Sequence, residues 1–196
     1  TFGDRLEHRT PLHYCCATLG DAAKATLLIE AGAKLNIQDA QFKTPLHLAI
    51  EEGHDNVIDT LLRAKANVNL GNVESGMKNT PLMDAAHAGK YDLAGKLIAG
   101  KADINAQGKS DMSALHLAAR RGDFNVVQLL VAARADVAQT SQCGTAADLA
   151  KKRAGSTALL ELLGVEAEGP GVSLAEKKPT CIASLDAAQR AALFLE

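Results

Sequence analysis

Five of the six histidines in this chain raise the question of metal binding or acid–base chemistry. His13 and His47 each end the phrase Thr-Pro-Leu-His, and His116 ends Ser-Ala-Leu-His, whereas His54 and His87 stand alone. Zinc ligands must converge to within about 2 Å of one ion. The first three histidines instead hold equivalent places in successive copies of one phrase, so we expect them to be structural. His54 and His87 are expected at the surface, and no metal site is predicted.

The other reactive residue types form no recognisable catalytic set. Cys15 and Cys16 are neighbours on a short predicted helix, so they cannot easily bond each other and suit a small-residue core. Glycines occur singly, without a phosphate-binding loop. The pair Glu51-Glu52 is typical of a solvated face. The sequence therefore predicts a protein that is not an enzyme and needs no cofactor.

Composition limits the remaining classes of function. The chain has 196 residues, 47% of them apolar, 3% aromatic, and a formal net charge of −2. This balance gives no general electrostatic case for nucleic acid, and no apolar run approaches the roughly 18 residues of a membrane span. The four cysteines form no CxxC pair and favour a reducing compartment. We expect a cytoplasmic protein; the short basic run Lys151-Lys152-Arg153 leaves a nuclear location as the alternative.

The histidine phrase is part of a longer repeat. It begins at Thr10, Thr44 and Thr80, and in altered form at Ser113, with spacings of 34, 36 and 33 residues. Self-similarity at a fixed period in this range indicates a repeat architecture. Each copy must therefore supply one structural unit that stacks on its neighbours.

The second copy shows how one unit is built. Thr44 is a good helix N-cap, and Pro45 suits the first helical position. Gly53 tolerates the left-handed geometry that ends a helix, and Asp55 can cap a second helix. Apolar residues follow at helical spacing in both segments. One unit is therefore predicted as helix, tight turn, helix and extended hairpin.

These residues resemble the ankyrin repeat. The Thr-Pro-Leu-His phrase, a glycine at each inter-helix turn (Gly20, Gly53, Gly89, Gly122) and paired apolar residues in each second helix carry the resemblance. It implies a mainly α solenoid over residues 1–163, in which each imidazole bonds its Thr and nearby backbone. The expected units are about 5–38, 39–71, 72–107, 108–139 and 140–163. A linker is expected over 164–180, and a capping helix over 181–196.

Several positions depart from the family pattern. The first unit has one extra residue near Leu19, and the hairpin before the third unit is longer, at 72–76. Lys65, Lys101 and Arg134 replace the glycine that usually ends the second helix. A non-glycine residue in left-handed geometry costs about 1 kcal/mol, so distorted helix ends are expected there.

The resemblance implies a non-catalytic scaffold that binds a protein partner on a concave groove and on hairpin tips. Because neighbouring units consume the apolar faces, a monomer is expected. The positions that match the family's partner-contacting ones are Arg9, Tyr14, Thr18, Gln41, Lys43, Leu48, Glu51, Glu52, Lys78, Asn79, Asp84, His87, Met112, Leu117, Arg120, Arg121, Lys152 and Arg153. In the family, asparagines at the unit exits can be hydroxylated by an oxygen-dependent enzyme, which makes Asn36, Asn69 and Asn105 candidate modification sites.

The charges of the last first-helix positions change sign along the chain. They read Glu51-Glu52, then His87-Ala88, then Arg120-Arg121, then Lys152-Arg153. A groove that runs from acidic to basic predicts a partner with an acidic patch facing units four and five. Two alternatives stay open: a regulatory segment of a larger enzyme or channel, and nucleic-acid binding through the basic fourth and fifth units.

Overall fold

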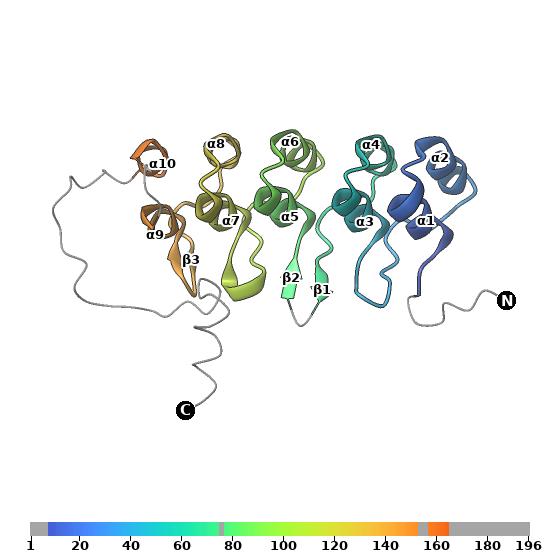
Figure 1. Ribbon diagram of the computed structural model, residues 1–196, viewed down its shortest axis with the longest axis horizontal. Coiled ribbons are helices and arrows are strands. Elements are labelled where there is room, and N and C mark those ends of the chain that lie inside the picture. Colours follow the sequence, from blue (N-terminus) through green and yellow to red (C-terminus); the bar gives the residue numbers. More distant parts are fainter. Residues whose placement is uncertain (1–7, 75–76, 153–156, 165–196) are drawn as a thin grey trace, which may run out of the picture.

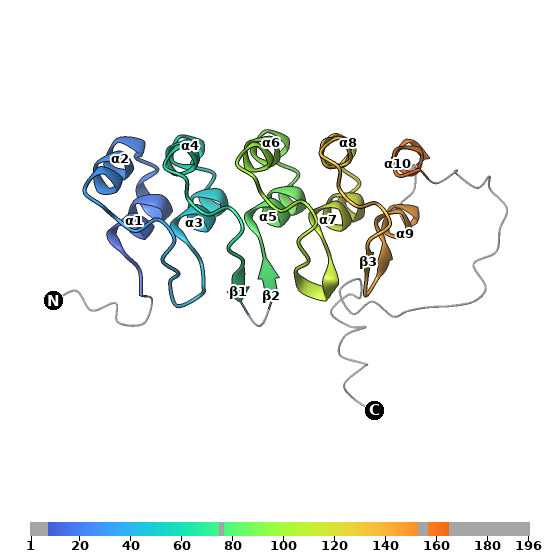
Figure 2. The same ribbon diagram turned by 180° about the vertical axis from the view of Figure 1, so that it is seen from behind.

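The computed structural model describes residues 8–74, 77–152 and 157–164, which form an elongated array of helix pairs in two layers (Figures 1 and 2). The first helices of the units form one layer: α1 (Pro11–Tyr14) with the π-helical turn η1 (Cys15–Leu19), α3 (Pro45–Glu52), α5 (Pro81–Ala88), α7 (Ala114–Arg121) and α9 (Ala146–Lys151). The second helices form the other: α2 (Ala22–Glu30), α4 (Asp55–Arg63), α6 (Tyr91–Ala99), α8 (Phe124–Ala132) and α10 (Thr157–Leu162). This confirms the predicted helical repeat solenoid.

Loops and short hairpins project from the layer of first helices (Figure 1). Strand β1 (Asn72–Glu74) pairs antiparallel with β2 (Met77–Asn79), and β3 (Thr140–Ser141) pairs with β4 (Gly144–Thr145). A 3₁₀ turn, η2 (Lys109–Asp111), occupies the projection between them. The longer hairpin expected before the third unit is thus the β1–β2 pair. The predicted linker over 164–180, apart from Gly164, and the predicted capping helix over 181–196 lie outside the described residues.

The first helices begin as their sequence predicts. In α3 the Thr44 hydroxyl accepts a hydrogen bond from the His47 backbone N–H at 3.5 Å, and His47 Nδ1 accepts one from the Thr44 backbone N–H at 3.2 Å. This reciprocal capping box satisfies two backbone donors at the helix start. His13 and His116 accept the corresponding bonds at 3.0 and 3.2 Å. The three imidazoles are confirmed as structural.

The starts of the second helices differ from the prediction. Asp21 and Asp123 cap α2 and α8 through their carboxylates. In the second repeat, however, Asp55 is already the first helical residue, and His54 holds the cap position without a side-chain bond to the helix. The His54 ring instead lies 2.9 Å from the Cys16 carbonyl oxygen, in the preceding repeat. The prediction that Asp55 is the cap, and that His54 is an isolated surface residue, is therefore wrong.

Contacts of this backward kind recur along the array. Lys90 Nζ donates to the Ile50 carbonyl oxygen at 3.0 Å, and Arg121 Nη1 donates to the His87 carbonyl oxygen at 3.0 Å. Both acceptors lie near the C-terminal end of a first helix, where carbonyl groups lack helical partners. At Gly89, which has a φ of 71°, a Cβ atom would lie 2.7 Å from Arg121 Nε. Glycine is needed there both for the left-handed turn and for the approach of the next repeat.

The unusual helix ends keep normal geometry. Lys65, Lys101 and Arg134 have φ values of 63°, 66° and 68°, all left-handed. The backbone N–H of Lys65 donates to the Leu62 carbonyl oxygen at 3.0 Å, much as that of Gly32 donates to Ile29 at 2.9 Å. The expected distortion is therefore wrong: these residues adopt the glycine conformation at a cost of about 1 kcal/mol each.

The extra residue of the first unit is accommodated by a change of helix type. Residues Cys15–Leu19 form a π-helical turn, and Gly20 closes it with a φ of 56°. A π-helical turn holds one more residue than an α-helical one, so the insertion leaves the start of α2 in place. The predicted insertion is confirmed.

A continuous apolar core runs between the two layers. The leucines of the repeated phrase are almost fully buried, as are the equivalent leucines of α4, α6 and α8: Leu12, Leu46, Leu82, Leu115, Leu61, Leu97 and Leu130. Cys15 and Cys16 are buried in the same core, as predicted. Among the described helices, none has the length and apolar character to cross a lipid bilayer.

Candidate functional site

The first helices and the loops that precede them expose equivalent side chains from successive repeats along one groove. Three positions of each repeat define the groove in repeats two to four. The residue before the repeated phrase is Lys43, Asn79 or Met112. The residue one turn into the helix is Leu48, Asp84 or Leu117. The residue in the last helical turn is Glu51, His87 or Arg120.

In repeats two and four, a side-chain bridge joins the first and third of these positions. Lys43 Nζ lies 2.9 Å from Glu51 Oε1, and Arg120 Nη1 lies 3.8 Å from the Met112 sulfur. The leucine between the bridging positions is buried in both repeats, with 3% of Leu48 exposed and 8% of Leu117. In these two repeats the bridge and the buried leucine therefore close the base of the groove.

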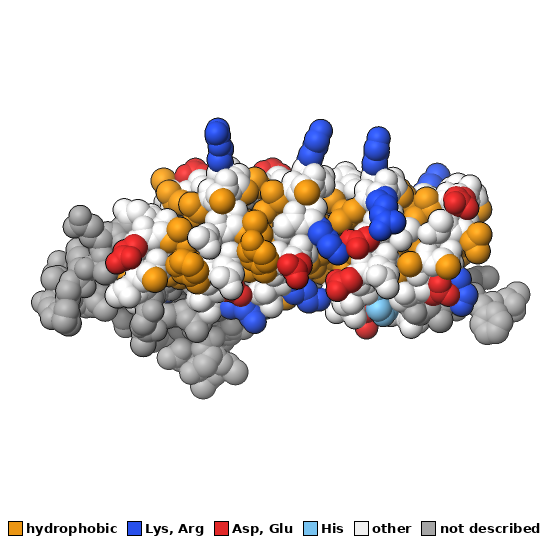
Figure 3. Space-filling model, turned by 90° about the horizontal axis from the view of Figure 1, so that it is seen from above, with side chains coloured by type: hydrophobic (Ala, Val, Ile, Leu, Met, Phe, Trp, Pro, Cys, Tyr) orange, Lys and Arg blue, Asp and Glu red, His pale blue; other side chains and the backbone are white. Residues whose placement is uncertain are grey.

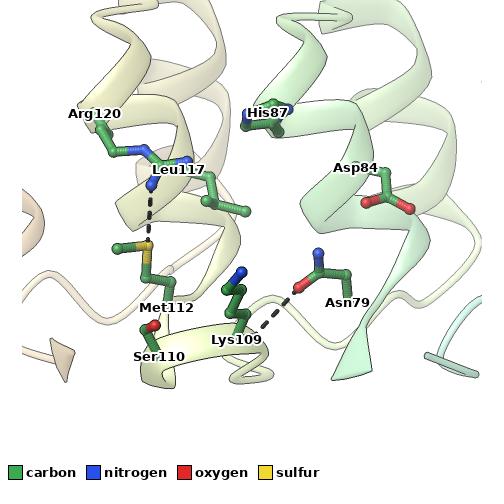
Figure 4. Close-up of a pocket in the computed structure, with 8 residues that line it drawn as sticks. All are labelled: Asn79, Asp84, His87, Lys109, Ser110, Met112, Leu117 and Arg120. Carbon is green, nitrogen blue, oxygen red and sulfur yellow. Dashed lines mark hydrogen bonds between the residues drawn. The ribbon is translucent and has the colours of Figure 1, made fainter. Parts of the chain in front are cut away.

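Repeat three lacks this bridge. Asn79 Oδ1 instead accepts a long bond of 3.4 Å from the backbone N–H of Lys109, and the His87 side chain makes no hydrogen bond to a described residue. A hollow of about 220 Å³ opens here between α5 and α7. We call it the groove hollow; it is lined by Asn79, Asp84, His87, Lys109, Ser110, Met112, Leu117 and Arg120 (Figure 4).

Sequence reasoning named six of these eight residues in advance. Lys109 and Ser110 were missed, although η2 has a counterpart in repeat two. The Gly108 backbone N–H donates to the Met112 carbonyl oxygen at 2.9 Å, as that of Asp39 donates to Lys43 at 2.9 Å. The left-handed residues of η2, Ser110 and Asp111, each with a φ of 57°, carry the chain across the end of the hollow. The predicted groove residues of repeats three and four thus converge on one place, although nothing in their local spacing required it.

Asp84 is the unusual group in the hollow. It takes the place that Leu48 and Leu117 hold in the neighbouring repeats, and its carboxylate has no hydrogen bond or ion pair to any described residue. Removal from water raises the pKa of Asp84 to about 7; the nearby Glu51 charge adds to this, and Lys43 opposes it. A carboxyl group at the base of the groove therefore lacks both full hydration and a partner.

The remaining predicted contact residues lie elsewhere along the groove or at its ends. Tyr14, Thr18, Gln41, Glu52 and Lys152 are exposed, and Arg9 Nε lies 3.3 Å from Asp39 Oδ2. The side chain of Lys78 and all of Arg153 lie outside the described part of the chain. Their role in binding stays a prediction.

Three predicted contact residues are largely buried. Leu48 and Met112 are each 3% exposed and Leu117 is 8% exposed, so they form the base of the groove. Their role in binding stays a prediction. Arg121 is half exposed but is held on the His87 carbonyl oxygen.

The role of the charge order along the first helices in binding a partner also stays a prediction. Glu51 and Glu52 are exposed in repeat two, Arg121 in repeat four and Lys152 in repeat five. The face of the second helices differs: charges of both signs are scattered among apolar side chains (Figure 3). The order of charges is therefore confined to the last helical turn of the first helices.

The candidate asparagines make structural contacts. Asn36 Oδ1 accepts a bond from the backbone N–H of Asn67 at 2.9 Å, and Asn69 and Asn105 accept equivalent bonds from the next repeat. Their amide oxygens therefore link neighbouring repeats. Whether they are hydroxylated stays a prediction.

The described residues offer little for metal binding, and their two free cysteines are buried. Cys143 is disulfide-bonded, which goes against the reducing compartment expected from the sequence. No group of three or more His, Cys, Asp or Glu residues in the described part of the chain could hold a metal ion. Burial lowers the pKa of His47 to about 4, so its imidazole is neutral at physiological pH. Burial likewise raises the pKa of the Cys16 thiol to about 12, which keeps it from forming the nucleophilic thiolate.

Comparison with known proteins identifies the repeat. Residues 2–72 match the family described as ankyrin repeats (3 copies), and residues 82–131 match ankyrin repeats (many copies). The Nuclear factor NF-kappa-B p105 subunit of Gallus gallus is 32% identical over 140 residues, which are 70% of this chain and 14% of that protein. The B-cell lymphoma 3 protein homolog of Mus musculus is 31% identical over 130 residues, 66% of this chain and 27% of that protein.

A channel protein shows the same relationship. The Transient receptor potential cation channel subfamily A member 1 of Drosophila melanogaster is 32% identical over 130 residues, 64% of this chain and 10% of that protein. The chain thus spans less than a third of the length of each of these relatives. The two family matches cover more than half of the chain, in the same repeats that the capping boxes and inter-helix turns define, and the chain belongs to the ankyrin-repeat family.

Proposed function

We propose that this array is a non-catalytic scaffold that binds a protein partner along its groove and at its hairpin tips. Ankyrin repeats are in general modules of protein–protein interaction. The observation that carries the proposal is the groove hollow, where side chains from two repeats surround one opening. A partner that reaches into it would contact both repeats at once.

The dimensions of the hollow favour a macromolecular partner over a small metabolite. Pockets for small molecules usually enclose about 300–1,000 Å³ and bury most of the ligand. The groove hollow is smaller, at about 220 Å³, and it is one part of a surface that extends over several repeats. Such a surface suits a protein segment that places a few side chains in successive repeats.

The change of charge along the groove bears on the orientation of the partner. Glu51 and Glu52 lie in repeat two, whereas Arg120 and Lys152 lie in repeats four and five. We propose that the partner presents an acidic patch to the last two repeats. Opposite charges would steer the encounter and set the register of the partner along the array.

The test compares what the groove and the opposite layer capture from cell lysate. The whole chain serves as bait in three forms: wild type, a groove variant carrying Glu51→Lys and Arg120→Glu, and a control variant carrying Arg63→Glu and Asp92→Lys. The control residues are exposed charges on α4 and α6. Quantitative mass spectrometry should show proteins retained by wild type and control but lost from the groove variant. Equal capture by all three forms would contradict the proposal.

A second candidate is that the array is a regulatory segment of a longer protein. The comparisons favour it, because the matched region is 14% of the p105 subunit and 10% of the channel protein. The complete reading frame decides the matter. An enzyme or channel domain on the same reading frame would support this candidate, and a reading frame that contains only the array would rule it out.

A further inference from the structure

In the part of the chain that the structure describes, Asp84 is the one acidic side chain that lines the groove hollow. Asp84 projects from α5 and lines this space together with Leu117 of the next repeat (Figure 4). Within the described residues its carboxylate has no partner. An ionised carboxylate that is withdrawn from water and unpaired is costly, and the cost is recovered when a cation reaches it.

The charges on the repeat-two side of Asp84 do not supply that cation. Glu51 of α3 and Lys43 of the preceding loop are the charged residues whose fields act on Asp84. Lys43 Nζ is already bonded to both Glu51 oxygens, at 2.9 and 3.1 Å. This side of the hollow therefore holds two carboxyl groups and one ammonium group.

The basic side chains on the repeat-four side of the hollow do not bond to Asp84 either. Arg120 of α7 directs Nη1 toward the Met112 sulfur, and the Lys109 side chain rises from η2 between Met112 and Asn79 (Figure 4). His87 lies on α5 itself, one turn beyond Asp84, and is exposed. None of the three forms a hydrogen bond or ion pair with the carboxylate.

Building on the proposed function, we propose that the groove hollow takes a lysine or arginine side chain of the protein partner, whose cationic head pairs with Asp84. The methylene groups of that side chain would lie along Leu117 and Met112, which form apolar walls of the hollow. Long basic side chains bury their stems in this way while the head finds an oxygen acceptor. Because Lys109 and Arg120 also line the hollow, the incoming cation must lie against Asp84 and away from those two side chains.

Pairing with a cation makes binding depend on pH. Because the pKa of Asp84 is about 7 in the free protein, about half of the molecules carry a proton there at neutral pH. A partner cation that requires the ionised form must displace that proton. We expect affinity to fall about tenfold from pH 8 to pH 6, as the ionised fraction falls about tenfold.

The experiment uses random-sequence peptides displayed on phage and selected on the whole chain. Enriched peptides are synthesised, and their dissociation constants are measured for wild type, Asp84→Asn and the matched control Asp92→Asn. Asp92 is an exposed aspartate on α6 of the same repeat. The melting temperature of each variant is measured first; Asp84→Asn preserves the size of the side chain and should remain folded.

Groove-dependent peptides should contain a lysine or arginine and should bind Asp84→Asn at least tenfold more weakly, with Asp92→Asn unchanged. Replacing that basic residue by norleucine should weaken binding to wild type and have no further effect on Asp84→Asn. The pH dependence of binding should be larger for wild type than for Asp84→Asn.

The results distinguish a failure of the Asp84–cation pairing from a failure of the groove as a protein-binding surface. Peptides that lose affinity for the Glu51→Lys, Arg120→Glu groove variant but bind Asp84→Asn as tightly as wild type would overturn the inference and leave the groove as a binding surface. Selection of acidic peptides, insensitive to Asp84→Asn, would do the same. If no selected peptide depends on the groove, both the inference and the proposed function fail.

Discussion

The side-chain oxygen of Asn69 lies 2.7 Å from the backbone nitrogen of Asp103, one repeat further along the chain. Asn36 makes the equivalent contact with Asn67, and Asn105 with Asp136. Each asparagine oxygen therefore accepts a hydrogen bond from a backbone N–H group of the following repeat. In a linear array, bonds of this kind contribute to the interface between nearest neighbours and set how cooperatively the repeats unfold.

Replacing Asn69 by alanine should weaken that interface. We expect the free energy of unfolding to fall by about 1–2 kcal/mol, because two hydrogen bonds are lost: the one that Asn69 Oδ1 accepts from the Asp103 backbone N–H and the one that Asn69 Nδ2 donates to the Lys101 carbonyl oxygen. Urea denaturation followed by circular dichroism measures the change. Asn125→Ala, an exposed site on α8, is the control and should change stability by less than about 0.5 kcal/mol. Equal effects of the two substitutions would contradict the structural role of Asn69.

The end of α4 offers a substitution that should increase stability. Lys65 has a φ of 63°, a conformation that glycine adopts without strain, so Lys65→Gly should raise the free energy of unfolding by about 0.5–1 kcal/mol. Gly32 is the matched site, with a φ of 86° and nothing within 4 Å of an added Cβ atom. Gly32→Lys should therefore lower stability by about 1 kcal/mol.

Thermal and urea unfolding of both variants provide the check. Opposite changes are expected because the two sites share one backbone geometry and differ in residue type. Destabilisation by Lys65→Gly would show that the lysine side chain makes a compensating contact.

The parts of this fold that sequence predicts correctly depend on neighbouring residues in the chain. Thr44, Pro45 and His47 specify the start of α3 through bonds within four residues, so the motif alone reveals it. The role of His54 depends instead on the Cys16 carbonyl oxygen, 38 residues away. The local pattern gave Asp55 as the helix cap because it contains no information about that acceptor.

The groove shows the same limit. Repeat alignment identified Asp84 as a groove residue, but the state of its carboxyl group depends on three repeats at once. Leu117 of the next repeat lines the same hollow, and Lys43 of the preceding repeat is already paired with Glu51. Whether such a residue is hydrated or withdrawn from water follows only from side-chain positions in the assembled array.

Asp84 should make stability depend on pH in a defined direction. Its pKa is raised from 3.8 to about 7 in the folded state, so between these values the folded chain binds more protons than the unfolded chain. The contribution of this group to stability is therefore full below about pH 3.8 and falls as pH rises toward 7. His47, whose pKa is lowered to about 4, acts in the opposite sense: its contribution is full above 6.5 and falls as pH decreases to about 4.

Comparing Asp84→Asn with wild type separates the two groups, because the histidine contribution is common to both proteins. The variant should be more stable than wild type by about 1–3 kcal/mol at pH 8, and by less at pH 5. Urea unfolding at the two pH values measures the difference. A stability difference that does not change with pH would show that Asp84 titrates normally in the folded protein.

The two arginines at the end of α7 should have different effects when replaced. Arg121 Nη1 donates to the His87 carbonyl oxygen at the end of α5, whereas Arg120 lines the groove hollow. Arg121→Ala should therefore lower the free energy of unfolding by about 0.5–1.5 kcal/mol and increase hydrogen exchange at the C-terminal turn of α5. Arg63→Ala, an exposed position on α4, is the control for removing a surface arginine. If Arg121→Ala leaves both the stability of the chain and the hydrogen exchange of α5 unchanged, the bond to His87 does not stabilise the repeat interface.

Arg120→Glu should act mainly on binding. It should slow association with a partner that carries an acidic patch, and it should reduce the salt dependence of that association rate.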